Sequence, residues 1–217
     1  MDYSSQKQYF ETAYNTGSDH WTHVAFSEKG SDLTKFLKPG MMILDLGSGR
    51  GQFPFELTLD GFRVIGLDYV KSIVDKNNEE VKNRKLDKNM RFLEGDVFNI
   101  PLTDASFDAV TDVGLLQHIH PEDWIEYRME VNRVLKPGGY FFLIALSKET
   151  KSFFTWHPKR EPFGTYDREG VQYHFFTKEE LELLFDGTFK LVSERVDTVT
   201  LHHDPTAFFV MVFQKPE

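Results

Sequence analysis

After residue 40, short apolar runs alternate with longer amphipathic stretches, and few folds accommodate such a sequence. The apolar runs read MMILDL, RVIGLD, MRFLEGD, FDAVTDV and YFFLIAL. Such runs are typical of strands buried on both faces of a parallel sheet. The stretches between them predict helices over residues 52–59, 70–85 and 121–135, and Gly61 suits a left-handed helix end. The alternation therefore predicts an α/β fold with helices on both faces of a sheet.

The carboxyl-terminal part of the chain departs from this alternation. Pro137-Gly138-Gly139 predicts a turn before the fifth strand, and two further β-rich runs, FKLVSERVDTVTL and AFFVMVFQK, follow near the end. The gap between these runs, 202–205, is too short for a crossover helix, so we expect them to pair antiparallel. The sequence thus predicts a three-layer α/β sandwich with a seven-stranded, mostly parallel sheet whose last strand is antiparallel.

A length of 217 residues and the absence of a low-complexity linker favour a single domain with terminal elaborations. We expect a helical cap over 1–40, a core over 41–146, a loop-like insertion over 147–176, and a helix followed by a β-hairpin over 177–217. Ligand sites in such sheets gather at the carboxyl ends of the strands. The cap and the insertion are therefore candidate walls of a site.

Composition excludes several kinds of site and partner. The chain has no cysteine, which excludes disulfides, thiolate metal sites and a cysteine nucleophile. The formal net charge of -9 opposes binding to the phosphate backbone of nucleic acids. No stretch approaches the roughly 20 consecutive apolar residues that span a bilayer. The start, MDYSSQKQYF, lacks the basic and apolar segments of a signal peptide. We therefore expect a cytoplasmic protein without a nucleic-acid or membrane partner.

The most specific local signal is the segment DLGSGRG, residues 45–51, which lies between an apolar strand and a helix. Glycines here let the backbone approach a ligand closely, and the first turn of the helix offers free N–H groups. A tight strand-to-helix turn without a ligand is the alternative. Asp68 closes the second strand, where a carboxylate can accept both hydroxyls of a ribose. The spacing differs from the Gly-x-Gly-x-x-Gly of dinucleotide sites, and Asp45 is a poor neighbour for a pyrophosphate but suits an ammonium group.

In their order along the chain, five segments resemble the motifs of the class I S-adenosylmethionine-dependent methyltransferases, which have a Rossmann-like fold. The segments are ILDLGSGRG, VIGLDYV, FLEGDVFNIPL, SFDAVTDVGLLQHI and LKPGGYFFLI, within residues 40–146. The resemblance implies an enzyme that takes S-adenosylmethionine as its cofactor and releases S-adenosylhomocysteine. Beyond residue 146 the resemblance is architectural only.

The same resemblance implies positions for the cofactor. Asp68 would hold the ribose and Asp96 the adenine amino group, with Asp112 near the methionine end. The complete set of expected cofactor-binding residues is Trp21, Asp45, Gly47, Ser48, Gly49, Gly51, Asp68, Tyr69, Asp96, Val97, Asp112 and Val113. The alternatives are a turn cap for Asp96 and a surface acid at the strand end for Asp68.

Residues near the expected methyl group are candidates for contact with the acceptor. His118, in the segment LLQHIH, has a near-neutral reference pKa and suits a general base, although a structural histidine bonded to backbone is an equal alternative. Tyr14 of the cap and Trp156, His157 and Tyr173 of the insertion are candidates for substrate binding, with surface packing as the alternative.

Several absences narrow the reaction. The segment after the fourth strand, DVGLL, lacks the Asn/Asp-Pro-Pro-aromatic run that grips an amino nitrogen in adenine and glutamine methyltransferases. No set of oxygen ligands for a metal stands out. We therefore expect methyl transfer to an oxygen or nitrogen atom of a small molecule, by a monomer or homodimer without a metal. Methylation of protein or RNA, and a non-catalytic partner subunit, are the alternatives.

Overall fold

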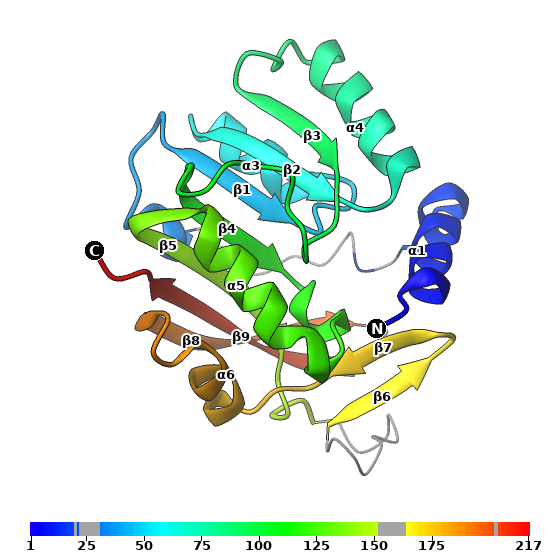
Figure 1. Ribbon diagram of the computed structural model, residues 1–217. Helices are drawn as coiled ribbons and strands as arrows, with labels where there is room; N and C mark the ends of the chain where they lie inside the picture. Colours follow the sequence, from blue (N-terminus) through cyan, green and yellow to red (C-terminus); the bar gives the residue numbers. More distant parts are fainter. Residues whose placement is uncertain (20, 22–30, 152–163, 202–203) are drawn as a thin grey trace.

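The computed structural model describes residues 1–19, 21, 31–151, 164–201 and 204–217. These residues form three layers, with a central sheet between two layers of helices (Figure 1). The strands are β1 (Met42–Leu46), β2 (Arg63–Asp68), β3 (Met90–Glu94), β4 (Phe107–Val113), β5 (Leu135–Leu146), β6 (Thr165–Arg168), β7 (Val171–His174), β8 (Lys190–Leu201) and β9 (Asp204–Gln214). The helices are α1 (Ser4–Thr16), α2 (Ser31–Thr34), α3 (Gln52–Leu59), α4 (Lys71–Asn83), α5 (Trp124–Val134) and α6 (Lys178–Phe185), with short 3₁₀ turns η2 (Leu116–His118) and η3 (Pro121–Asp123).

The main sheet has seven strands in the order β3-β2-β1-β4-β5-β9-β8. Neighbours from β3 to β5 are parallel, whereas β9 pairs antiparallel with both β5 and β8. The seven-stranded, mostly parallel sheet with its antiparallel last strand confirms the expected fold class. After β3 the chain returns to the centre of the sheet to form β4, which makes the β1/β4 boundary a topological switch point.

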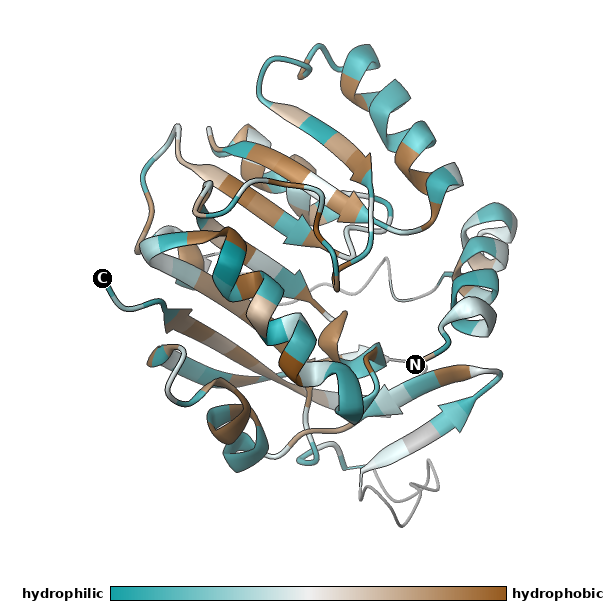
Figure 2. Ribbon diagram, in the orientation of Figure 1, coloured by the Kyte–Doolittle hydropathy of each residue, from teal (hydrophilic) through white to brown (hydrophobic). Residues whose placement is uncertain are grey.

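The apolar runs are continuous because both faces of the sheet are covered. Along β5, Phe141, Leu143 and Ala145 pack on the face covered by α5 and α6, while Phe142 and Ile144 pack on the face covered by α2 and α3. In Figure 2 the central strands are accordingly rich in hydrophobic residues, whereas the helices alternate between hydrophobic and hydrophilic. Burial on both sides removes the polar alternation of a one-sided sheet.

Two predicted segments differ in detail from the structure. The helix expected over 121–135 begins as the turn η3 and ends at Val134, and Leu135 already pairs with Phe107 before a register shift leads to Tyr140 opposite Ala109. This early pairing accounts for the shorter helix. The turn predicted at Pro137-Gly138-Gly139 was wrong, because these residues lie inside β5, where its register against β4 shifts.

The insertion expected to be loop-like contains the antiparallel pair β6–β7. Its two-residue turn consists of Glu169 (φ 57°) and Gly170 (φ 80°), and positive φ at both positions matches the twist of a hairpin. The hairpin lies beside η2 and the start of α1, at the edge of the sheet where the parallel strands end (Figure 1). Within the described residues, no helix has the length and apolar character needed to cross a bilayer.

Candidate functional site

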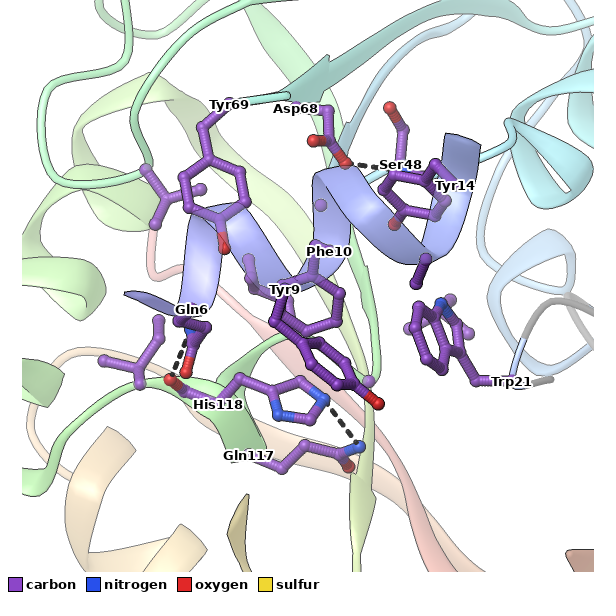
Figure 3. Close-up of a pocket in the computed structure, with 18 of the residues that line it drawn as sticks. Gln6, Tyr9, Phe10, Tyr14, Trp21, Ser48, Asp68, Tyr69, Gln117 and His118 are labelled. Carbon is purple, nitrogen blue, oxygen red and sulfur yellow. Dashed lines mark hydrogen bonds between the residues drawn. The ribbon is translucent and has the colours of Figure 1, made fainter. Parts of the chain in front are cut away.

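A cavity of about 650 Å³ lies at the carboxyl ends of β1, β2, β3 and β4, under helix α1. This volume falls within the range of small-molecule sites. In Figure 3, Asp68 and Tyr69 lie toward one end, and Gln117 and His118 lie toward the other, with Phe10 of α1 between them. The hairpin β6–β7 and the beginning of β9 complete the lining.

The glycine-rich loop after β1 forms one wall of the cavity. Gly47, Gly49 and Gly51 all have positive φ, and a Cβ on Gly51 would lie 2.5 Å from the ring of Phe92. Only glycine adopts this run of conformations without strain and without a clash. Gly47 and Gly49 line the cavity, whereas Gly51, also expected to bind the cofactor, faces Phe92 and Phe55 and does not line it.

Asp68 ends β2 inside the cavity and braces the glycine loop. Its two carboxylate oxygens accept hydrogen bonds from the backbone N–H groups of Gly49 and Val70, each at 2.9 Å. Burial raises the pKa of this carboxyl, and the backbone N–H groups of Val70, Gly49 and Tyr69 together with the charge of Lys7 partly oppose the rise. Each oxygen keeps a further lone pair that is not used by these bonds. Asp68 is thus positioned to accept hydrogen bonds from a ligand.

Asp45 and Ser48 place polar atoms at the floor of the cavity. Asp45 is 3% exposed and accepts a hydrogen bond of 2.5 Å from the Thr111 hydroxyl. The Ser48 hydroxyl oxygen is buried and has no hydrogen-bond partner in the part of the chain that the structure describes. A buried polar atom without a partner is costly, so this hydroxyl is suited to a ligand.

The loop after β3 provides the end of the cavity beside Tyr69. Asp96 is exposed, lines the cavity and accepts a hydrogen bond of 2.9 Å from the backbone N–H of Phe98. Val97 and Tyr69 line the same end, and burial raises the pKa of the Tyr69 hydroxyl. The expected grouping of Asp68, Tyr69, Asp96 and Val97 around one end is therefore present.

Asp112 does not line the cavity, whereas its neighbour Val113 does. The Asp112 carboxylate is fully buried and accepts hydrogen bonds from the backbone N–H groups of Leu115 (2.7 Å) and Leu116 (3.0 Å) and from the Tyr127 hydroxyl (2.6 Å). Burial raises its pKa to about 6. Asp112 therefore braces the loop that carries His118, and it does not line the cavity where the resemblance implies a cofactor contact.

Helix α1 and the segment after it close the cavity with aromatic rings. Trp21 packs edge-on against Tyr14 and Phe10, with ring centroids 6.1 and 5.4 Å apart, and stacks on Tyr9 at 6.2 Å. Tyr14 lies over Gly49, where a Cβ would come within 2.9 Å of its hydroxyl. Tyr14, which was expected to bind substrate, therefore lies against the glycine loop.

Arg50 of the glycine loop fastens the cap to the cavity. Its guanidinium donates hydrogen bonds to both carboxylate oxygens of Asp19 (2.5 and 2.6 Å) and to the carbonyl of Tyr14 (2.9 Å). This bidentate ion pair is part-buried, and the partner raises the pKa of the arginine. The tertiary fold thus connects Tyr14 and Asp19 to the middle of the glycine motif.

His118 lies at the far end of the cavity, where three segments meet. Its Nδ1 is 2.8 Å from the carbonyl oxygen of Gln172 in β7, and its ring packs edge-on against Phe10 and Tyr173. Burial lowers the pKa of this imidazole to about 4. The ring is therefore neutral at physiological pH, and one nitrogen carries a lone pair.

Tyr173 lines the cavity from the hairpin, whereas Trp156 and His157 lie outside the described residues. Sequence reasoning overlooked Gln6, Tyr9, Phe10 and Gln117, which also line the cavity. Gln117 directly precedes the candidate base in the sequence, and the three others share one face of the helix predicted in the cap. That spacing was the available signal.

Comparison with known proteins identifies the fold and the core. Residues 44–143 match the family model described as a methyltransferase domain. Over these residues, slightly less than half of the chain, the sequence resembles a methyltransferase domain. The family uses S-adenosylmethionine, which confirms the cofactor expected from the sequence.

Relatives of the methyltransferase domain include enzymes of different substrate classes. Phosphoethanolamine N-methyltransferase 1 of Triticum aestivum is 33% identical over 141 residues, which cover 64% of this chain and 26% of that protein. Demethylmenaquinone methyltransferase of Lactococcus lactis is 34% identical over 135 residues, which cover 61% of this chain and 50% of that protein. The chain thus spans about a quarter to a half of the length of these relatives.

A solved structure shares nearly the whole fold with this chain. The crystal structure of 1,6-didemethyltoxoflavin-N1-methyltransferase from Burkholderia thailandensis superposes with a TM-score of 0.81 at 24% identity, covering 99% of this chain and 88% of that one. That crystal contains 1,6-didemethyltoxoflavin and S-adenosylhomocysteine. At this identity the likeness demonstrates the common fold.

The residues around the cavity of the methyltransferase domain fit S-adenosylmethionine. The cofactor needs an acceptor for ribose hydroxyls, a close backbone approach and donors for its carboxylate. Asp68 presents its carboxylate to the cavity at the end of β2, and Gly49 lies so close to Tyr14 that a Cβ there would leave no space between them. The buried Ser48 hydroxyl has no hydrogen-bond partner among the described residues. Asp45 adds a negative charge suited to the ammonium group.

Proposed function

We propose that this chain transfers a methyl group from S-adenosylmethionine to an oxygen or nitrogen atom of a small molecule. The observation that carries the proposal is a single cavity that joins the Asp68 end to the aromatic end around His118 and Tyr173. The cofactor supplies an electrophilic methyl group on a sulfonium. The chain has to bind the acceptor, align its reacting atom and exclude water, and such alignment is worth roughly 7–11 kcal/mol of barrier.

The proposed cofactor contacts divide along the cavity. Asp68 accepts the ribose hydroxyls, Asp96 and the backbone N–H of Val97 bind the adenine, and the glycine loop with Asp45 and Ser48 holds the amino-acid part. Trp21, Tyr69 and Val113 cover the cofactor from the cap and from the ends of β2 and β4. Each contact uses a residue that lines the cavity.

The enclosure of the cavity supports a small acceptor. Helix α1 covers one side, and the hairpin β6–β7 with Tyr173 covers another, so the cavity is enclosed by side chains of the cap and of the hairpin. The names of the relatives refer to phosphoethanolamine, demethylmenaquinone and 1,6-didemethyltoxoflavin, all of them small molecules. The net charge of -9 also disfavours a polyanionic acceptor such as RNA.

His118 is the proposed proton acceptor for a nucleophile that carries hydrogen. It lines the cavity beside Tyr173, and its lowered pKa keeps the ring neutral, which is the form that accepts a proton. Tyr173 packs against the ring of His118 with centroids 4.7 Å apart and is placed to contact the acceptor.

The expected division into a cap over 1–40, a core over 41–146, an insertion over 147–176 and a carboxyl-terminal part over 177–217 is part of the proposal.

The class of methyl acceptor is tested by following labelled methyl groups from S-adenosylmethionine. Purified protein is incubated with methyl-labelled S-adenosylmethionine and a host-cell lysate, and the label is separated by molecular size. Label in the small-molecule fraction supports the proposal, whereas label in protein or RNA contradicts the acceptor class.

The cofactor contacts are tested by calorimetry with S-adenosylhomocysteine. Asp68→Ala is expected to weaken binding by more than about tenfold, or ~1.4 kcal/mol. Asp75→Ala is the matched control, because Asp75 is an exposed acid on α4 that pairs with Lys71. Unchanged affinity in Asp68→Ala contradicts the ribose contact.

A further inference from the structure

The side-chain amide of Gln117 has a fixed orientation beside His118. Gln117 is buried, and its Oε1 accepts a hydrogen bond of 3.0 Å from the backbone N–H of Leu146 at the end of β5. The oxygen therefore faces the strand, and the NH₂ group faces the imidazole. Gln117 Nε2 lies 3.4 Å from Nε2 of His118 (Figure 3).

The hydrogen bonds around His118 determine its tautomer. A carbonyl oxygen only accepts, so Nδ1, 2.8 Å from the Gln172 carbonyl, carries the ring hydrogen. The other nitrogen, Nε2, is then the acceptor that receives an N–H from Gln117. At 3.4 Å this contact is longer than the usual 2.9–3.0 Å, so the lone pair is only weakly engaged.

The backbone around this histidine is also held by side-chain amides. Gln6 of α1 donates to the His118 carbonyl (3.1 Å) and accepts from the backbone N–H of Gln172 (3.3 Å). The Gln172 side chain donates to the Ile119 carbonyl (2.8 Å). The Gln172 carbonyl that receives the Nδ1 hydrogen is therefore itself fixed. The His118 ring cannot turn without breaking its own contacts to Gln172 and Gln117.

We propose that Gln117 is a positioning residue: it reinforces the tautomer that the Gln172 carbonyl sets, with hydrogen on Nδ1, through a long contact to Nε2 that the N–H or O–H hydrogen of the methyl acceptor displaces. This inference rests on the proposed function and deepens it. It assigns the acceptor to molecules whose reacting nitrogen or oxygen carries hydrogen. The burial that lowers the pKa of His118 acts in the same direction, because an N–H donor facing Nε2 disfavours the protonated ring.

The charged and titratable groups on the surrounding elements do not hydrogen-bond this ring. The hairpin contributes Arg168, Glu169 and Tyr173 to the same cavity, α1 contributes Tyr9, and β1 contributes Asp45. The contacts of the ring nitrogens in the described part of the chain are those to Gln172 and Gln117. These two contacts are therefore the ones to perturb.

The proton transfer follows from this arrangement. As the acceptor atom bonds to the methyl carbon, the carbon–sulfur bond breaks with its electron pair on sulfur, and the hydrogen leaves the acceptor atom as a proton on His118 Nε2. A weak base suffices because the acceptor atom becomes strongly acidic as it gains positive charge. The Gln117 N–H then opposes the proton on Nε2 and promotes its release to water.

The test reads the imidazole directly by nitrogen NMR of protein labelled with ¹⁵N-histidine and saturated with S-adenosylhomocysteine. The His118 signals are assigned from their loss in His118→Asn. In the wild type we expect hydrogen on Nδ1, none on Nε2, and no titration between pH 5.5 and 8, since the pKa is about 4. Hydrogen on Nε2 in the neutral ring overturns the proposal without any variant.

Gln117→Glu places a carboxylate opposite Nε2 and is expected to raise the pKa of His118 by about 1 to 3 units. Gln117→Met removes the donor and is expected to raise this pKa by less, while the Gln172 contact keeps hydrogen on Nδ1. Gln214→Glu is the matched control, a half-buried glutamine in β9 outside the cavity, and should leave His118 unchanged. An unchanged His118 pKa in both Gln117 variants overturns the positioning role.

The pH profile of label transfer into the small-molecule fraction of the lysate links the NMR result to turnover. Gln117→Glu should lose incorporation as the pH falls through the raised pKa of His118, while wild type stays flat above pH 5.5. A methylated carbon in the product overturns the proton transfer. If wild type transfers no label but the Gln117 variants shift the His118 pKa as expected, the proposed function fails and the positioning by Gln117 stands.

Discussion

Replacing Tyr127 with Phe tests Asp112, the buried acid beneath the loop that carries His118. The Tyr127 hydroxyl and Asp112 are both fully buried, and the hydroxyl donates to the carboxylate at 2.6 Å. Two backbone N–H groups, from Leu115 and Leu116, also donate to Asp112. The substitution removes one donor to the carboxylate and keeps the ring that packs against Phe141.

The loss of folding stability caused by Tyr127→Phe depends on pH. Burial raises the pKa of Asp112 from 3.8 to about 6, so its contribution to stability is complete below pH 3.8 and is lost as the pH rises through 6. That shift corresponds to about 3 kcal/mol of lost stability by pH 8. At pH 8 the hydroxyl donates to an ionised carboxylate, and its loss should cost about 1.5–3 kcal/mol. At pH 5 most of the carboxyl is protonated, and the cost should fall to about 1 kcal/mol.

Urea unfolding of wild type and Tyr127→Phe at pH 5 and pH 8 measures both differences. Tyr140→Phe is the matched control, because its hydroxyl accepts a single amide hydrogen bond of 3.2 Å and is only half-buried. The control should lose less than about 1 kcal/mol, equally at the two pH values. A Tyr127→Phe penalty that is equal at both pH values, or larger at pH 5, would refute the assignment of an ionised Asp112 held by this hydroxyl.

Three further changes test the cavity and a helix start. Gly49→Ala and Gly40→Ala both introduce a side chain at positive φ, and each should lower the free energy of unfolding by about 1–2 kcal/mol in urea. Only Gly49→Ala, whose Cβ would lie 2.9 Å from the Tyr14 hydroxyl, should weaken the binding of S-adenosylhomocysteine in calorimetry. Equal affinities in the two variants would contradict a close approach of the glycine loop to the cofactor. Arg50→Lys loses the bidentate ion pair with Asp19 and should speed the dissociation of S-adenosylhomocysteine by about tenfold in stopped-flow fluorescence. An unchanged dissociation rate would show that this ion pair does not hold the cap over the cavity. Thr177→Ala breaks the capping box of α6 and should lower the free energy of unfolding by about 0.5–2 kcal/mol without changing cofactor affinity.

The order of strands and helices in the core could be read from the sequence because burial leaves a local record. Strands covered on both faces are continuous apolar runs, and α3, predicted over 52–59, has those bounds in the structure. The two β-rich runs separated by 202–205 likewise pair antiparallel, because no helix fits between them. The turn Glu169-Gly170 was overlooked, since its hairpin lies within a segment that lacks strong apolar periodicity.

The sequence by itself determined the chain's fold, the glycine loop and the strand-end acid Asp68, because these depend on periodicity and on contacts between neighbouring segments. Only the tertiary structure decided that Asp112 turns into the core while Val113 faces the cavity, since that depends on the path of the loop beneath Tyr127. The same holds for the amide of Gln117, whose orientation is set by a strand end 29 residues away. Local pattern records which residues are buried, whereas the direction of a buried polar group is decided by the donors and acceptors that distant segments bring to it.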